Sequence, residues 1–330
     1  MGVESAVRFL GQKGDSGFKS PTVFRSCVES TLMMSVAGRG ADNLAGYWKM
    51  VNTAQRYLKI LREQPNMPKF LVSRVLWRTG LCSLFQIQKE GYRLKFHPTA
   101  LSAILWIDPQ DRGNDEAFLK RYLKEGDTVV DVGANIGDLT LTAALAIGPK
   151  GKVYSLEAHP RTYGFLRKNI ALNNCSNIIL FNLALGDKES EIFFSDLKWD
   201  DQNHVSGSSR GISVKMARLD HLALLESHIQ LLKIDVEGYE KFVLDGASTT
   251  LGKVSCIYFE SWERHFSKYG YACRDVINLL TGKGFTVLKF VDNESVVPVK
   301  VDHSSTVCEN LVAVRTLEDF LERTQFRLTA

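Results

Sequence analysis

Thr128-Val-Val-Asp-Val-Gly-Ala-Asn-Ile-Gly137 joins an apolar run, typical of a buried strand, to a turn that contains two glycines. Gly133 can adopt backbone angles that side chains forbid. Gly137 allows the following helix to pack closely, so that backbone N–H groups at the helix start can face a ligand. A dinucleotide site would need the spacing G-x-G-x-x-G to hold a pyrophosphate, whereas here Asn135 occupies the place of the second glycine. The stretch therefore indicates a nucleoside-cofactor site that differs from the usual dinucleotide site.

An acidic residue, Asp131, stands at the end of the apolar run. Its charge would repel a phosphate but suits a ligand that carries an ammonium group, as S-adenosylmethionine (SAM) does. Glu157 follows Gly137 by 20 residues, the separation at which an acid at the end of the second strand can bind both hydroxyls of a ribose. Asn135, Ile136 and Gly137 are expected to wrap the ligand through backbone groups. Bracing of the turn by Asp131 and a solvated charge at Glu157 stay open as structural alternatives.

Composition and charge set the broad class of the protein. The chain has 330 residues, of which 45% are hydrophobic and 24% charged, and its formal net charge is only +4. These values are typical of a globular protein, and the small charge without a long basic run does not indicate a nucleic-acid partner. No run approaches the roughly 18 apolar residues that a membrane-spanning helix needs, and no secretory signal is recognised. We therefore expect a cytoplasmic protein with reduced cysteines, of which Cys256 and Cys308 lie in apolar strands.

Residues 1–110 predict a mainly helical extension that carries no recognisable catalytic motif. Helical patterns cover 41–63 and 67–78, and the pattern of 83–97 predicts a hairpin. Apolar residues over 69–77 mix with Arg74 and the adjoining Arg78. A helix that packs on the main domain explains this stripe best, because apolar stripes usually belong to a core. A helix that lies on a membrane surface or on a partner is the alternative.

Residues 111–330 predict a single α/β domain. Helical and strand patterns alternate from about residue 114, which implies crossover connections and a mainly parallel sheet with helices on both faces. An added hairpin, with a polar loop inside it, is expected from 190–194 and 213–217. The seven strands expected in the main sheet are 128–132, 153–157, 177–182, 231–236, 254–260, 285–291 and 309–314.

Carboxylates stand at the ends of four of the expected strands. The carboxyl ends of parallel strands meet at one edge of the sheet, where ligands bind in open α/β folds. A row of acids at such an edge is unfavourable, because like charges repel and burial penalises ionisation. A cationic ligand with hydroxyl groups, such as SAM, would offset this penalty. The residues concerned are Asp131, Glu157, Asp235, Glu237 and Glu260.

A second strand-to-turn motif is Lys233-Ile-Asp-Val-Glu-Gly-Tyr-Glu240. The turn at Gly238 is expected to splay Asp235 and Glu237, so that one faces the cofactor and the other the acceptor. At this position the chain has neither the Asn/Asp-Pro-Pro-aromatic motif of amino-group methyltransferases that act on nucleic acid nor the Pro-Cys of cytosine-carbon methyltransferases. Carboxylates suit an alcohol acceptor, because a general base must take the hydroxyl proton as the oxygen attacks a methyl carbon.

Glu260 and His265 complete the predicted catalytic set of Asp235, Glu237, Glu260 and His265. Glu260 ends the fifth strand and faces the same crevice, so an acceptor-binding or base role is expected for it. His265 is a weaker candidate, since a lone histidine in such a loop is more often a surface residue. Mg²⁺ held by Asp235, Glu237 and Glu260 is an alternative. Their spacing has no metal signature, and we expect no metal.

Four motifs in order resemble the FkbM family of SAM-dependent methyltransferases. They are Glu125-Gly-Asp-Thr-Val-Val-Asp-Val-Gly-Ala-Asn-Ile-Gly137, Asn169-Ile-Ala-Leu-Asn173, Ala184-Leu-Gly186 and Lys233-Ile-Asp-Val-Glu-Gly238. The resemblance covers about residues 114–291. It implies the class I methyltransferase fold, a Rossmann-like sheet of seven strands whose last strand is antiparallel. It also implies O-methylation of a hydroxyl on a sugar, a polyketide or a related metabolite.

The same resemblance assigns the contacts to SAM. Four contacts lie in residues 131–137, which we call the glycine turn: Asp131, Gly133, Asn135 and Gly137. Glu157 is the acid after the second strand, and Ala184 would lie beside the adenine. The family often has Glu-Pro after the second strand, where this chain has Glu157-Ala-His-Pro160. The acid is retained, so only the local turn and the adenine edge depart from the family pattern.

We therefore expect a SAM-dependent O-methyltransferase. Its acceptor would be a hydroxyl oxygen of a small molecule, a sugar, or a glycan- or lipid-linked molecule. A non-catalytic SAM-binding scaffold, which uses the N-terminal helices to hold a partner, is one alternative. An NAD-dependent dehydrogenase is a weaker alternative. Peripheral contact with a membrane also stays open.

Overall fold

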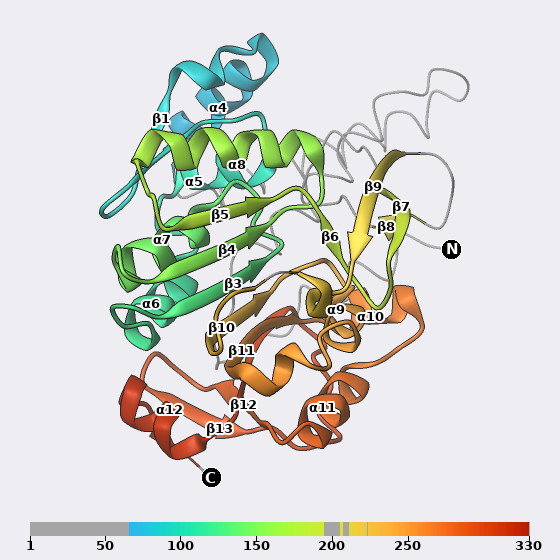
Figure 1. Ribbon diagram of the computed structural model, residues 1–330. Coiled ribbons are helices and arrows are strands. Elements are labelled where there is room, and N and C mark those ends of the chain that lie inside the picture. The colour runs from blue at the N-terminus through green and yellow to red at the C-terminus, as the bar shows by residue number, and fades with distance from the viewer. Residues whose placement is uncertain (1–65, 195–204, 207–210, 223, 330) are drawn as a thin grey trace, which may run out of the picture.

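The structure, a computed structural model, describes residues 66–194, 205–206, 211–222 and 224–329. Figure 1 shows a central sheet with helices on both faces and a smaller sheet beside it. The helix that the sequence predicts at 41–63 lies outside the described residues.

In the described part of the chain, nine strands form the central sheet. In chain order they are β3 (Thr128–Val132), β4 (Lys152–Leu156), β5 (Ile178–Phe181), β10 (Ile229–Ile234), β11 (Val254–Ser261), β12 (Thr286–Phe290), β13 (Ser295–Pro298), β14 (Glu309–Val314) and β15 (Arg327–Leu328). Their order across the sheet is β15-β13-β12-β14-β11-β10-β3-β4-β5. From β5 to β11 all neighbours are parallel, and β14 is antiparallel to both β11 and β12. The seven predicted strands are confirmed, including the antiparallel last strand of the class I methyltransferase fold.

Two strands at one edge of the sheet were not predicted. β13 pairs antiparallel with β12, and β15 pairs parallel with β13. β15 has only two residues and β13 only four, so neither is long enough to show an alternating pattern. β13 ends at Pro298, a residue that edge positions tolerate because proline has no N–H to donate to a ladder.

Helices cover both faces of this sheet. They are α6 (Gly113–Tyr122), α7 (Asp138–Ile147), α8 (Pro160–Asn173), α9 (Glu240–Asp245), α10 (Glu263–Phe266), α11 (Cys273–Gly282) and α12 (Leu317–Thr324), with 3₁₀ turns η5 (Leu219–His221), η6 (Thr250–Lys253) and η7 (Ser267–Tyr269). Successive strand residues point to opposite faces. Val130 accordingly packs in one buried cluster with side chains of α9 and α11, and Val129 packs in another with side chains of α6, α7 and α12. The predicted α/β layering is therefore confirmed.

The predicted added hairpin belongs to a second sheet. Its strands are β6 (Ala184–Leu185), β7 (Ser190–Phe194), β8 (Val205–Ser206) and β9 (Ile212–Ala217), in the order β6-β9-β7-β8. β7 and β9 pair antiparallel, as predicted, with Ser190 opposite Met216. β6 pairs in parallel with β9 and thereby holds Ala184 against Met216. This sheet follows β5 directly in the chain.

The described residues before α6 pack against the glycine turn. They form α4 (Met67–Thr79), the 3₁₀ turn η3 (Leu81–Leu84), β1 (Gln86–Gln88), β2 (Arg93–Lys95) and α5 (Ala100–Ile107). β1 and β2 pair antiparallel within the segment for which the sequence predicts a hairpin. Leu94 and Leu105 share a buried cluster with Ile136 of the glycine turn and Leu166 of α8. These contacts pack the glycine turn against β2, α5 and α8.

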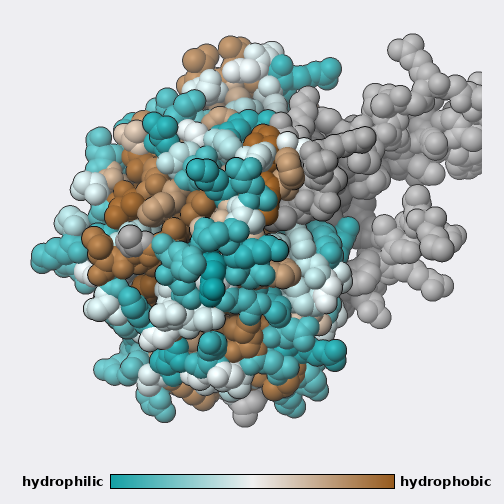
Figure 2. All heavy atoms as spheres, turned by 45° about the vertical axis from the view of Figure 1, so that its right-hand side comes forward, coloured by the Kyte–Doolittle hydropathy of each residue, from teal (hydrophilic) through white to brown (hydrophobic). Residues whose placement is uncertain are grey.

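The helix α4 has one packed face and one open face. Phe70 and Leu76 are buried, whereas Leu71 and Val75 are exposed. Figure 2 shows apolar residues at the top of the molecule, the end at which Figure 1 places α4. None of the helices in the described part of the chain is long and apolar enough to cross a membrane.

Candidate functional site

The turn between β3 and α7 is shaped by close packing against its neighbours. Gly133 and Gly137 have φ angles of 79° and 90°, which glycine adopts without strain. A Cβ on Gly133 would lie 1.8 Å from the carbonyl oxygen of Asp235, and one on Gly137 would lie 2.5 Å from a methyl of Leu166. Gly137 therefore makes room for α8 rather than for the following helix α7, which was the expected neighbour. Gly133 lets the end of β10 approach the turn.

Glu157 fastens this turn to the end of β4. Its carboxylate accepts hydrogen bonds from the backbone N–H of Asn135 and from that of His159, each at 2.9 Å. Glu157 thus braces the turn, at the end of the strand where the sequence predicts the ribose.

Asn135 provides a second group that fits a nucleoside ligand. Its backbone has a left-handed φ of 49°, an uncommon conformation that asparagine tolerates better than most residues. Its side-chain oxygen is buried and makes no hydrogen bond to any part of the chain that the structure describes. A buried acceptor without a donor is unfavourable. A hydrogen-bond donor on a bound ligand would satisfy it, and SAM carries such donors on its ribose, its adenine and its ammonium group.

Ala184 lies at the same end of the sheet. It is buried in β6 and packs in a cluster with Met216, to which Ala158 and Tyr239 also belong. Ala158 follows Glu157 directly in the chain. The side chain of Asn182 donates to the backbone carbonyl oxygens of Glu157 and Ala158, both at 2.9 Å. These contacts bring β6 beside the end of β4, where the adenine edge is predicted.

Asp131 and Asp235 share one buried cation. Lys233 Nζ lies 3.0 Å from Asp131 Oδ1 and 3.6 Å from Asp235 Oδ2. It also donates to the carbonyl oxygen of Gly133 at 3.0 Å. Burial alone would lower the pKa of Lys233, but the two carboxylates raise it above its ordinary value. Asp131, which also accepts a bond from the hydroxyl of Thr140, is thus tied to the protein itself.

Arg112, the residue before α6, completes this buried network. Its guanidinium contacts Asp115 at 3.1 Å, Asp235 at 3.3 Å and Asp138 at 3.7 Å. Burial would raise the pKa of Asp235, but the charges of Lys233 and Arg112 lower it below the ordinary value. A carboxylate with a lowered pKa is a weak base. Asp235 is therefore suited to carry a fixed negative charge.

The turn after β10 separates the two acids of the second motif. Glu237 has a left-handed φ of 55° and Gly238 one of 101°. Asp235 is directed to Arg112 and Lys233, whereas Glu237 is directed to His265. This is the splayed arrangement that the turn at Gly238 predicts.

The buried side chain of Glu240 accepts hydrogen bonds from the backbone of that turn. Its Oε1 accepts from the backbone N–H groups of Val236 and Gly238, at 3.1 and 3.3 Å. Burial and then the nearby charge of Glu260 raise the pKa of Glu240 to about 8. A buried carboxyl group therefore fixes the backbone that carries Glu237.

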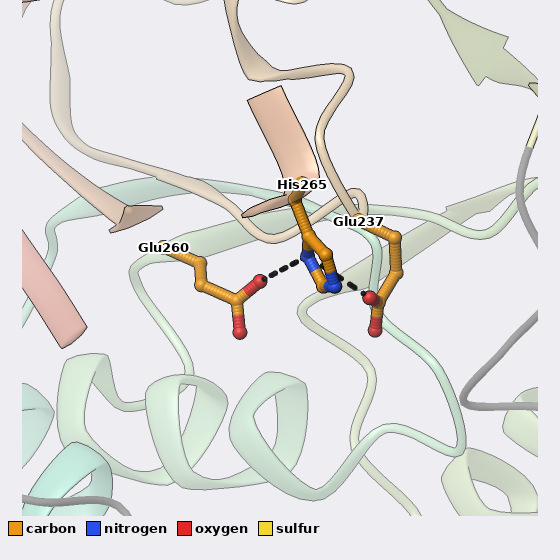
Figure 3. Close-up of side chains that lie close together, drawn as sticks. All are labelled: Glu237, Glu260 and His265. Atoms are coloured by element: carbon orange, nitrogen blue, oxygen red, sulfur yellow. Dashed lines mark ion pairs between the residues drawn. The ribbon is translucent and has the colours of Figure 1, made fainter. Parts of the chain in front are cut away.

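Glu237, Glu260 and His265 converge at the edge of the sheet. His265 Nδ1 lies 3.3 Å from Glu237 Oε2 and 3.4 Å from Glu260 Oε2. Figure 3 shows the imidazole between the two carboxylates. A Cβ on Gly238 would lie only 2.7 Å from the carbonyl oxygen of His265, so the glycine allows α10 to approach the turn. We refer to these three side chains as the Glu–His–Glu cluster.

Two expectations about this region were wrong. His265 is 9% exposed and packs against Trp262, whereas the sequence favoured a surface position. Cys308 precedes β14 instead of lying in it, and its thiol donates to Glu260 Oε1 at 2.9 Å. Burial and then the charge of Glu260 raise the pKa of this thiol. Both side chains turn inward because the ends of β11 and β14 meet here.

The chain is similar to known methyltransferases. The family model described as Methyltransferase FkbM domain matches residues 131–287. The 2-O-methyltransferase NoeI of Sinorhizobium fredii is 30% identical over 179 residues, which are 48% of this chain and 72% of NoeI. The hexuronic acid methyltransferase AglP of Haloferax volcanii is 27% identical over 179 residues, which are 52% of this chain and 71% of AglP.

A solved structure of an FkbM methyltransferase, from Methylobacillus flagellatus, is 12% identical to this chain with a TM-score of 0.37. It is matched over 78% of this chain and 60% of its own.

Proposed function

Since the chain belongs to the FkbM family of methyltransferases, which use SAM, we propose that it methylates a hydroxyl oxygen of a sugar or a glycan. The observation that carries this proposal is the Glu–His–Glu cluster near the glycine turn, in which His265 Nδ1 lies 3.3 and 3.4 Å from the two carboxylates. The names of NoeI and AglP, a 2-O-methyltransferase and a hexuronic acid methyltransferase, support a sugar as the acceptor class.

The glycine turn and the end of β4 would hold SAM. Glu157 would accept from the ribose hydroxyls, and the free acceptor of Asn135 would receive a ligand donor. Gly133 and Gly137 keep the turn in place, and Ala184 would border the adenine. When bound, SAM supplies an electrophilic methyl group on a positively charged sulfur.

The acids near the cofactor have different roles in this proposal. Asp131 is neutralised by Lys233, so it positions the turn. Asp235 stays ionised between Lys233 and Arg112, so it would hold the end of β10 beside the turn and would not take a proton from the acceptor.

The Glu–His–Glu cluster would act on the acceptor. The acceptor oxygen must lose its proton as its bond to the methyl carbon forms, and the electron pair of the broken C–S bond stays on sulfur. Glu237, Glu260 and His265 offer oxygen and nitrogen atoms that accept such a proton. General-base catalysis of this kind contributes about 10²- to 10⁴-fold.

The test is methyl transfer from SAM that carries ¹³C in its methyl group to a panel of monosaccharides, uronic acids and glycans. We expect one labelled methyl group per product, with an NMR correlation between the methyl carbon and a sugar-ring proton across oxygen. Labelling of nitrogen or carbon would contradict the proposal. SAM binding without transfer to any hydroxyl compound would favour the non-catalytic scaffold, and binding of NAD instead of SAM would favour a dehydrogenase.

A further inference from the structure

The Glu–His–Glu cluster has the spacing of a metal-binding site. One ligand atom from each of Glu237, Glu260 and His265 lies within 4.8 Å of the others. His265 Nδ1 lies 3.3 Å from Glu237 Oε2 and 3.4 Å from Glu260 Oε2. In a shell with metal–ligand distances of about 2.0–2.2 Å, neighbouring ligand atoms lie about 2.8–3.6 Å apart. Both separations fall in that range.

His265 Nδ1 provides the second observation. The side chain is nine-tenths buried, and this nitrogen is fully enclosed, yet it makes no hydrogen bond with any residue for which the structure gives a position. It is aimed between two carboxylate oxygens (Figure 3). A buried nitrogen without a hydrogen bond is unfavourable, and one imidazole nitrogen with two carboxylates is a donor set that suits a divalent cation.

Asp235 does not belong to this donor set. Its carboxylate is held by Lys233 and Arg112, so it is already neutralised by the chain. The sequence alone suggested Asp235, Glu237 and Glu260 as the metal alternative. The geometry replaces Asp235 by His265, which no sequence spacing indicates.

We propose that Glu237, Glu260 and His265 bind one divalent cation, with one carboxylate oxygen from each glutamate and Nδ1 of the histidine as ligands. Two carboxylates and one imidazole favour an ion that accepts both oxygen and nitrogen, such as Mn²⁺. Three protein ligands leave coordination positions open. The role of the ion rests on the proposed function: the acceptor hydroxyl would occupy an open position, where the cation favours loss of the hydroxyl proton to a glutamate oxygen of the cluster that does not bind the ion.

The local backbone is built to bring these ligands together. Glu237 has a left-handed conformation, which is strained for most non-glycine residues and persists where the surrounding structure enforces it. Glu240 fixes the turn from inside, and Gly238 allows His265 to approach. Such enforced strain is typical of ligand-binding positions.

Binding of Mn²⁺ tests the site without SAM and without an acceptor. The full chain is stripped with EDTA, dialysed and titrated with Mn²⁺, while the EPR signal of the free ion is recorded. We expect one bound Mn²⁺ per chain. Electron spin echo measurements should show coupling of the ion to one imidazole nitrogen.

Variants identify the ligands. We expect Glu237→Gln, Glu260→Gln and His265→Ala each to weaken Mn²⁺ binding by about tenfold or more. The matched controls Asp245→Asn and His221→Gln remove a carboxylate and an imidazole from outside the cluster, and they should bind Mn²⁺ as the unaltered chain does. Binding of S-adenosylhomocysteine reports whether each variant is folded.

Two results would overturn the inference. One is that the unaltered chain binds no more Mn²⁺ than a variant that carries Glu237→Gln, Glu260→Gln and His265→Ala together. The other is that the nitrogen coupling persists in His265→Ala. If the chain binds no Mn²⁺ and still methylates a sugar in EDTA, the proposed metal site is wrong and the proposed function stands. If it binds Mn²⁺ but methylates no acceptor, the proposed function is wrong and the metal site stands.

Discussion

Arg112 supports the ionised side chains near the carboxyl ends of β3 and β10. Its buried guanidinium contacts Asp115, Asp138 and Asp235 within 3.7 Å. Removal of one partner from a buried ion-pair network leaves charges without compensation, which typically costs about 3–5 kcal/mol. We therefore expect Arg112→Met to lower the free energy of unfolding by this amount, as measured by urea denaturation.

Arg327→Met is the matched control for Arg112→Met. Arg327 pairs with Glu294, and both side chains are more than two-thirds exposed. Exposed ion pairs contribute little, so the change should stay within about 0.5 kcal/mol. Equal effects of the two substitutions would show that the buried network does not stabilise the fold.

The contact of Lys233 with Asp235 is easier to predict from the sequence than the contact of Arg112 with Asp235. Lys233 stands two residues before Asp235 on a predicted strand, so the two side chains share a face, and in the parallel sheet Lys233 pairs with Asp131. That contact depends on the pairing of β10 with β3 in the sheet. Arg112 is 123 residues from Asp235 in the chain and lies before a helix. No local pattern indicates such a contact, because it depends on how α6 packs on the sheet.

At the scale of elements, the turn between β10 and α9 predicts a pH dependence of stability. The pKa of Glu240 is about 8 in the folded protein against an ordinary value of 4.5. Between these values the unfolded chain loses the proton while the folded chain keeps it, so folding stability falls as the pH rises and then levels off above about pH 8. Glu240→Gln mimics the protonated side chain. We expect the unaltered protein to lose stability relative to this variant between about pH 4.5 and 8.

Thermal unfolding in EDTA from pH 5 to pH 9 measures this difference, which can reach about 1.4 kcal/mol per pH unit. Glu294→Gln, at an exposed carboxylate, should show no such trend. A constant difference between Glu240→Gln and the unaltered protein over the whole range would contradict the raised pKa. A difference that grows in the opposite direction would contradict it as well.

The strands of the main sheet were predictable because each is an apolar run between turn residues. Of the five that run in parallel, β3, β4, β10 and β11 are largely buried on both faces, and this gives them continuous apolar patterns, whereas β5 is partly exposed. β6, β8 and β15 have two residues each and carry no pattern of their own. They pair only because longer neighbours bring them into register. The left-handed backbone at Glu237 also has no local signal, since Gly238 alone was expected to shape the turn.

At the scale of the whole molecule, the parallel sheet gathers acids that are far apart in the sequence. β3, β4, β10 and β11 are parallel, so Asp131, Glu157, Asp235 and Glu260 lie at the same edge. The sequence predicts this gathering. It does not separate the acids into the two groups that the structure shows, one neutralised by Lys233 and Arg112 and the other around His265. That division depends on Arg112 before α6 and on His265 of α10, which are far apart in the sequence.

The central claim is that the Glu–His–Glu cluster acts on the acceptor while the glycine turn holds the cofactor. The most direct test is kcat for methyl transfer to the identified sugar, compared between the unaltered protein, Glu237→Gln and His265→Ala, with Asp245→Asn as the control. We predict that kcat falls about 10²- to 10⁴-fold in the two cluster variants while the affinity for S-adenosylhomocysteine is unchanged. A kcat equal to that of the control in both variants would contradict the account.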